Sequence, residues 1–265
     1  MQTLVQILAS FALQNGAYRV TGETDWLQGR TLFGGLIAGL ANHAMRQRVP
    51  ADRPLRALQV VYIGPNSAGE VEFEPSVQRE GKAVTLATCT ARSDGAVSMT
   101  ATAMYGAARE SRLDIQPLSD TVLIRPDQLS DVAARAEMPG FTQHYQQRWA
   151  RGAPLFSRAT DSTMSVYVRY RDEPIAHTTE THALALMDAI PSPALALLEK
   201  PSPASTLSWT LEILDHQFAF GIDQWWRLDA HVDAAADGYV VHTSHVINPA
   251  GRVAAISRQV VVVYG

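Results

Sequence analysis

An aspartate inside an apolar run is the residue of this sequence best suited to chemistry. The run is ETHALALMDAIPSP, Glu180 to Pro193, and Asp188 is the one carboxylate between Ala183 and Ile190. An ionised carboxylate in apolar surroundings is costly unless it is hydrogen-bonded or paired. Two interpretations stay open: an Asp near a helix end that bonds to a neighbouring turn, or a carboxylate in a dry pocket that activates water.

A pair of glycines offers a second feature with chemical use. Gly34 and Gly35 precede an apolar, Ala-rich run from Leu36 to Met45, which we interpret as a buried helix. Glycines at a helix start leave backbone N–H groups open to a ligand, and the helix dipole favours negative charge there. Alternatively, these glycines and Gly39 let the helix pack tightly against a sheet, and both roles can hold.

Other common catalytic motifs are missing from the sequence. There is no G-x-S-x-G motif, and Cys89 lacks a recognisable partner. The histidines are scattered without the spacing of a zinc pair. We therefore expect no covalent nucleophile, no metal site and no cofactor.

The elements that position Asp188 and the glycines follow from hydrophobic spacing. We predict an N-terminal helix over Gln2 to Leu13 and a helix in the run that carries Asp188. Strands are expected at Gly16 to Val20, Leu55 to Gly64, Glu70 to Arg79, Ala83 to Arg92 and Ala96 to Tyr105. Further strands are expected at Thr142 to Ala150, Thr163 to Arg171, Thr206 to Leu214, Gln224 to Val232, Gly238 to Ile247 and Arg252 to Tyr264.

The two halves of the chain share one pattern. Each has a buried helix followed by four strands, and each ends in Tyr-Gly, at Tyr105 and at Tyr264. We predict an N-terminal unit over 1–108, a linker over 109–140 with a short helix at 128–137, and a C-terminal unit over 141–265. A curved antiparallel sheet with one apolar face needs a central helix to bury it, so the fold class is α+β.

Composition limits the class of protein. Of 265 residues, 46% are apolar and 18% charged, which is typical of a globular rather than a disordered chain. The net charge is −4 and no basic stripe is present, so we expect no nucleic-acid partner. One cysteine excludes an internal disulfide and indicates a reducing compartment. No run reaches membrane-spanning length and no basic leader begins the chain, so we expect a cytoplasmic protein without a membrane partner.

Three motifs carry a resemblance to a known family. They are GRTLFGGLIAGLA at Gly29 to Ala41, ALMDAIPSPAL at Ala185 to Leu195 and GRVAAISRQVVV at Gly251 to Val262. In order and spacing they resemble the two helices and last strand of TesB-type (thioesterase II) acyl-CoA thioesterases. Two helix-plus-sheet units in one chain likewise resemble the double hotdog fold of that family.

The resemblance implies a set of site residues. The family's catalytic Asp falls on Asp188, and its Gln, eight residues after a turn glycine, falls on Gln259. We expect the strand face with Gln259, Val261 and Val263 to be the inner one. A family Thr or Ser at the start of the strand after the second helix matches Thr206. Three neighbouring hydroxyl residues stay open as alternatives: Ser205, Ser208 and Thr210. By strand parity Ser208 and Thr210 share the face of Thr206.

The implied activity is hydrolysis of acyl-CoA to a free acid and CoA. Asp188 would accept a proton from water, and Thr206 and Gln259 would orient that water, without an acyl-enzyme. Phe33, Gly34 and Gly35 would contact the substrate, with backbone N–H groups facing the oxyanion. Apolar helix faces would line a tunnel for the acyl chain.

The first half offers a comparison with the second, and other functions compete. Asn42 and His43 stand where the second half has Asp188, and Ala103 where it has Gln259, so we expect an idle first half. One alternative is a non-catalytic acyl-thioester-binding protein. Another is an enoyl-thioester hydratase, although its G-D-x-N-P-x-H run is absent. The resemblance and an exposed sheet edge both predict a homo-oligomer, a dimer or larger.

Overall fold

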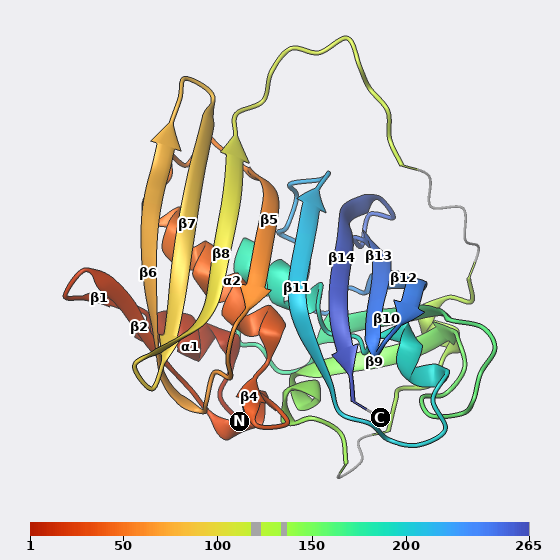
Figure 1. Cartoon of the computed structure of the whole chain (residues 1–265). Coiled ribbons are helices and arrows are strands. Elements are labelled where there is room, and N and C mark those ends of the chain that lie inside the picture. Colours follow the sequence, from red (N-terminus) through yellow and green to blue (C-terminus); the bar gives the residue numbers. More distant parts are fainter. Residues whose placement is uncertain (118–122, 134–136, 265) are drawn as a thin grey trace.

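The described residues form one 12-stranded antiparallel sheet with helices on one side (Figure 1). The structure is a computed structural model that describes residues 1–117, 123–133 and 137–264. The sheet's first-half strands are β1 (Ala12–Gln14), β2 (Ala17–Gly22), β5 (Leu55–Tyr62), β6 (Gly69–Glu80), β7 (Val84–Ser93) and β8 (Ala96–Gly106). The second half supplies β9 (Tyr145–Arg151), β10 (Thr163–Tyr170), β11 (Ala204–Ile213), β12 (Trp226–Ala236), β13 (Tyr239–Ile247) and β14 (Val253–Val263).

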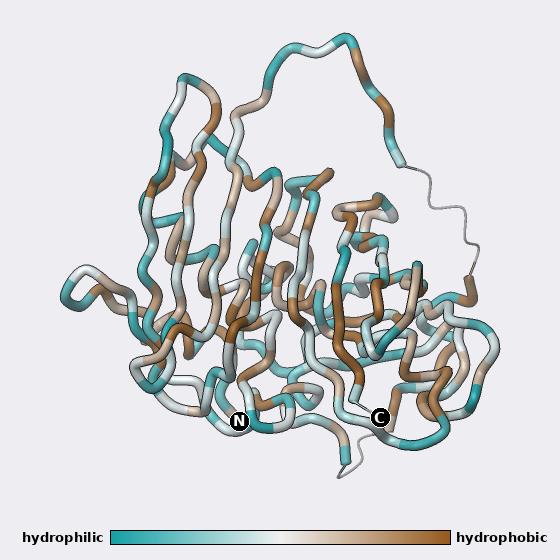
Figure 2. The backbone as a smooth tube through the Cα atoms, viewed as in Figure 1, coloured by the Kyte–Doolittle hydropathy of each residue, from teal (hydrophilic) through white to brown (hydrophobic). Residues whose placement is uncertain are grey.

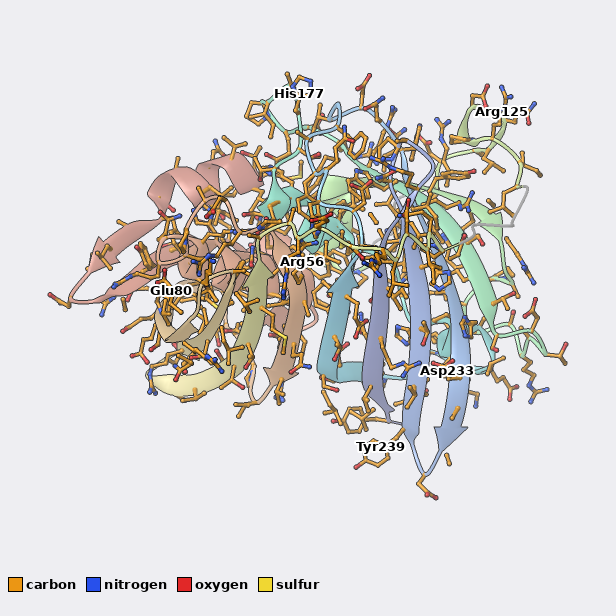
Figure 3. The ribbon with its side chains drawn as sticks, turned by 90° about the horizontal axis from the view of Figure 1, so that it is seen from above. Arg56, Glu80, Arg125, His177, Asp233 and Tyr239 are labelled. Carbon is orange, nitrogen blue, oxygen red and sulfur yellow. The ribbon has the colours of Figure 1, made fainter. Side chains whose placement is uncertain are left out.

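Strand order repeats between the two halves. The order is β1-β2-β6-β7-β8-β5, continued by β11-β14-β13-β12-β10-β9, so the second half reads as the first in reverse. The halves join where β5 pairs with β11, in a register that places Leu58 opposite Leu211. Arg56 of β5 lies at this junction (Figure 3) and bonds the His216 ring of the second half. The predicted repeat of two helix-plus-sheet units is therefore present, while the boundaries at 108 and 140 stay predictions.

Two central helices cover the sheet's inner face. They are α2 (Gly34–Arg46) and α3 (Glu180–Leu186), and most α2 side chains are buried. The helices touch at two glycines. A Cβ at Gly35 would lie 2.7 Å from the carbonyl oxygen of Ala185, and one at Gly39 would lie 3.1 Å from that of Thr181. Gly35 and Gly39 thus allow close packing as expected, but against the second helix rather than against the sheet.

The last strand shows how the sheet alternates between a buried and an exposed face. Figure 2 shows the valine-rich end of β14 as a continuous hydrophobic stretch. Along β14, Gln259 and Val261 are 7% and 4% exposed, whereas Arg258 is exposed. Gln259 and Val261 therefore lie on the inner face, as predicted, and Val263 is only partly buried.

Besides the helix expected to carry Asp188, three predicted elements differ from the structure. The first helix, α1, is only Leu4–Ser10, because Asn15 and Gly16 take positive φ in a tight turn that joins β1 to β2. A 3-10 helix at Gly140–His144 occupies the start of the strand expected at 142–150. At the helix predicted over 128–137, Gln128 ends a 3-10 helix (Pro126–Gln128) and 129–133 are not helical, which contradicts the prediction. Residues 134–136 lie outside the described residues.

The remaining elements are small. A hairpin of β3 (Leu27–Gln28) and β4 (Thr31–Leu32) precedes α2, and 3-10 helices occupy Thr24–Trp26 and Pro193–Ala196. Strands β1 and β9 end the sheet, and the homo-oligomer expected from an exposed sheet edge stays a prediction. No helix in the described part of the chain is long and apolar enough to cross a membrane.

Candidate active site

Asp188 lies just beyond the end of α3, not inside a helix as the apolar run predicted. The helix ends at Leu186, and the Asp188 amide donates to the Ala185 carbonyl in a tightened last turn. Pro191 follows, and a proline disfavours helical backbone in the residue before it. The Gln147 side chain of β9 donates to the Ala189 carbonyl at 2.7 Å and holds this turn. The turn aims the carboxylate back toward the sheet.

A hydrogen-bonded chain joins three of the predicted site residues. Gln259 Nε2 donates to Asp188 Oδ1 at 2.6 Å, and Thr206 Oγ1 donates to Gln259 Oε1 at 2.9 Å. Because the Thr206 hydroxyl donates its hydrogen to the Gln259 amide, its oxygen can accept a hydrogen bond from water. Asp188 Oδ2 is left outside this chain. The structure therefore brings together residues that are 71 and 53 positions apart.

A bulge in β11 decides which hydroxyl reaches the site. Thr206 pairs with Val261 and Ser208 with Val260, so Leu207 is the extra residue. Beyond it Trp209 and Leu211 are buried. Alternation then places Ser208 and Thr210 on the outer face. The parity that grouped these hydroxyls with Thr206 is wrong because it counts across the bulge, and Ser205 lines the nearby pocket only at an exposed position.

The N-terminus of α2 faces Asp188. A Cβ at Gly34 would lie 3.2 Å from Asp188 Oδ2, and one at Gly35 would lie 2.8 Å from the Cβ of Asp188. Only glycine fits this approach without movement. Phe33, in contrast, is 1% exposed and stacks on Phe141 with ring centroids 4.0 Å apart. The structure does not bring the Phe33 side chain to the pocket, where substrate contact was predicted.

Tyr62 belongs to the site and was missed from the sequence. Its hydroxyl donates to the Gly34 carbonyl at 3.0 Å. The N–H of the same peptide unit belongs to Gly35 and donates to Asp188. A hydrogen bond to a carbonyl polarises its peptide and strengthens the N–H on the other side. Parity with the buried Leu58 and Val60, at the end of β5, was a signal that could have placed Tyr62 inside.

Burial brings the pKa of Asp188 close to neutrality. Desolvation raises the pKa of Asp188 from 3.8 to about 7, although the hydrogen bonds from Gln259 and Gly35 lower it. A general base works best when its pKa lies near the operating pH. Burial raises the pKa of the Tyr62 phenol well above its usual value, and the negative charge of the nearby Asp188 raises it further, so the phenol stays protonated.

Asp188 opens onto a small pocket of about 70 Å³. Its walls come from the β3–β4 hairpin, the start of α2, the end of β5 and the start of β11. The lining residues are Gln28, Thr31, Leu32, Gly34, Tyr62, Gly64, Asn66, Asp188, Ala204, Ser205 and Thr206. Within the described residues no three His, Cys, Asp or Glu side chains gather as metal ligands do. The arrangement places a carboxylate, a hydroxyl and a helix N-terminus around a space large enough for water.

The corresponding place in the first half holds an amide. Asn42 is eight residues from the start of α2, as Asp188 is from the start of α3. Asn42 donates to the Glu180 carboxylate at 2.5 Å and accepts from Tyr105 at 2.8 Å. Arg46 pairs with the same carboxylate at 2.7 Å. The side chains here are satisfied by one another, and a catalytically idle first half stays a prediction.

Family models match nearly the whole chain. Residues 23–106 match the acyl-CoA thioesterase N-terminal domain, and residues 125–263 match the acyl-CoA thioesterase C-terminal domain. A search of curated proteins found no match.

Solved structures share the fold at low identity. A hotdog-fold protein of unknown function from Alicyclobacillus acidocaldarius has a TM-score of 0.87 at 21% identity, covering 100% of this chain and 99% of that one. A putative thioesterase II from Thermobifida fusca has 0.84 at 17%, covering 100% and 98%. An acyl-CoA thioesterase II from Mycobacterium marinum has 0.73 at 19%, covering 99% and 98%. The predicted double hotdog fold is confirmed.

Proposed function

This chain belongs to the acyl-CoA thioesterase family, and we propose that it hydrolyses acyl-CoA with a water molecule activated by Asp188, Gln259 and Thr206. Membership confirms the family resemblance of the three motifs and makes the protein a thioesterase. The proposal adds the substrate and the residues that act. The observation that carries it is the hydrogen-bonded chain from Thr206 through Gln259 to Asp188, beside the α2 N-terminus.

Asp188 acts as the general base in this proposal. Water in the pocket gives a proton to Asp188 Oδ2, the oxygen that faces Gly34, and its oxygen attacks the thioester carbonyl carbon. Thr206 accepts the other hydrogen of the water and so fixes its direction. The C–S bond then breaks, CoA leaves as the thiolate, and the proton on Asp188 neutralises it. The products are a free carboxylic acid and CoA.

The start of α2 supplies positive potential for the oxyanion. The first intrahelical amide bond is that of Ile37 to the Phe33 carbonyl, so the N–H groups before Ile37 have no partner within the helix. Gly35 uses its N–H on Asp188, which leaves that of Gly34 and the dipole of a 13-residue helix for the carbonyl oxygen. Because Gly34 and Gly35 have no side chains, the N-terminal end of α2 stays open to a ligand, whereas a larger residue at either position would block it.

The test is release of CoA from acyl-CoA by the purified chain. We expect wild type to release CoA and Asp188→Asn to lose at least about 10³-fold in kcat, the scale of removing a catalytic base. Asp52→Asn, an exposed Asp in the turn after α2, serves as the matched control and keeps its rate. Wild-type rates in Asp188→Asn would refute the mechanism. An inactive wild type that still binds acyl-CoA would favour the non-catalytic binding protein.

A further inference from the structure

The pocket beside Asp188 is small. Its volume is about 70 Å³. An engineered protein cavity of about 150 Å³ holds benzene, with its six carbons. The pocket is partly open to solvent, so this volume measures only the space between its walls. By that comparison the walled space takes roughly three carbon atoms, whereas pockets for drug-sized ligands span about 300 Å³ or more.

One wall of the pocket has no room to retreat. Leu32 is 2% exposed and packs on Gly22, where a Cβ would lie only 2.7 Å from the Leu32 Cδ1. The Leu32 amide donates to the Asn66 carbonyl at 2.6 Å, and the Thr31 hydroxyl accepts from the Asn66 amide at 2.9 Å. These bonds fix the β3–β4 hairpin against the chain that follows β5. An acyl chain longer than the space would have to displace this packed wall or leave its far end in solvent.

Aromatic side chains fill the space behind Asp188. A Cβ at Gly35 would lie 2.8 Å from both the Asp188 Cβ and the Phe33 ring, so Phe33 sits directly behind the carboxylate. The Phe33 ring stacks on Phe141, and Tyr145 meets both rings edge-on with centroids 6.2 and 6.3 Å away. The space directly behind Asp188 is therefore filled by packed side chains, and an acyl chain would have to enter from the pocket side.

The pocket also carries no group for an acyl carboxylate. Asp188 is the one charged side chain among its described lining residues, and none of them is Lys or Arg. A second carboxylate there would meet a like charge without a counter-ion, which is costly in a partly dry site.

We infer that the pocket selects short, uncharged acyl groups of about two to four carbons, with Leu32 setting the length limit. The inference rests on the proposed thioesterase function and narrows its substrate class. Forcing more methylenes into a filled space strains the packing around it. One methylene too many in a tight pocket costs about tenfold or more in kcat/KM.

The test is a kcat/KM series on acetyl-, butyryl-, hexanoyl-, octanoyl- and succinyl-CoA. For wild type we expect butyryl-CoA to exceed octanoyl-CoA and succinyl-CoA by at least about tenfold. Leu32→Ala removes the wall and should raise the octanoyl-to-butyryl ratio about tenfold. Leu32→Val should move the ratio in the same direction by less, and it retains more of the packing if Leu32→Ala does not fold.

Leu228→Ala provides the matched control, since Leu228 is a fully buried leucine of β12 that does not line the pocket. It should lower stability and leave the ratio unchanged. The inference is overturned if wild type hydrolyses octanoyl-CoA as fast as butyryl-CoA, or if neither Leu32 variant changes the octanoyl-to-butyryl ratio of kcat/KM. Either result leaves the proposed thioesterase function intact. If the wild-type chain hydrolyses none of the acyl-CoAs, the proposed function itself is overturned.

Discussion

Replacing Asp188 by Asn should abolish turnover and stabilise the fold at the same time. Burial raises the pKa of Asp188 from 3.8 to about 7, which means that the folded protein disfavours the ionised carboxylate. At about 1.4 kcal/mol per pKa unit, that difference corresponds to about 4 kcal/mol. Asp188 is partly open to the pocket, so solvent screens some of the cost. We expect Asp188→Asn to gain about 1 to 4 kcal/mol in free energy of unfolding at pH 8.

The sign of the pH dependence follows from proton binding. Between about pH 4 and pH 7 folded wild type keeps the Asp188 proton that the unfolded chain releases, so its stability falls as pH rises. The asparagine amide of the variant has no such proton to lose. The gain from the substitution is therefore nearly absent close to pH 4 and complete above about pH 7. Asn42 already shows an amide at the equivalent position of the first half.

The measurement pairs urea unfolding with a CoA-release assay at pH 5 and pH 8. A thiol reagent can follow CoA, because burial raises the pKa of the Cys89 thiol to about 12 and keeps it unreactive. Asp52→Asn should match wild type in both assays. The reasoning is refuted if Asp188→Asn unfolds at lower urea than wild type at pH 8, or if its advantage is equal at both pH values.

Three further outcomes test the rest of the site. In wild type, kcat/KM should rise with pH through about 7 as Asp188 ionises, and Gln259→Leu should move that midpoint to higher pH because the amide hydrogen bond lowers the Asp188 pKa. Thr206→Val should lower kcat by about 10²-fold through a misplaced water, whereas Ser208→Ala, on the outer face, should leave kcat unchanged, and equal losses would contradict the bulge assignment. Tyr62→Phe removes one neutral hydrogen bond to the Gly34 carbonyl and should lower kcat about threefold to tenfold with KM unchanged. If kcat, KM and the pH–rate profile of this variant all equal those of wild type, Tyr62 has no role in catalysis.

Much of the fold could be predicted because local patterns agree with tertiary packing. The Ala-rich run after Gly35 becomes α2, and the alternating runs become β5 to β8. Predictions failed where a few residues override a longer pattern. The Asn15–Gly16 turn converts the end of the expected first helix into β1. Met187, at the α3 C-cap, precedes a turn rather than a further helical turn, so Asp188 leaves the helix.

The sequence by itself determined the inventory of the site and its elements. Asp188 stands out as an unpaired acid among apolar residues, and strand alternation places Gln259 inward. Whether these groups meet depends on contacts between segments far apart in the chain, which no local pattern encodes. The bulge at Leu207 selects Thr206, the crossing of α2 and α3 brings Gly35 against Asp188, and the Phe33–Phe141 stack closes the space behind it. Tertiary packing decided these because each is a fit between surfaces, set by volume and hydrogen-bond geometry rather than by residue type.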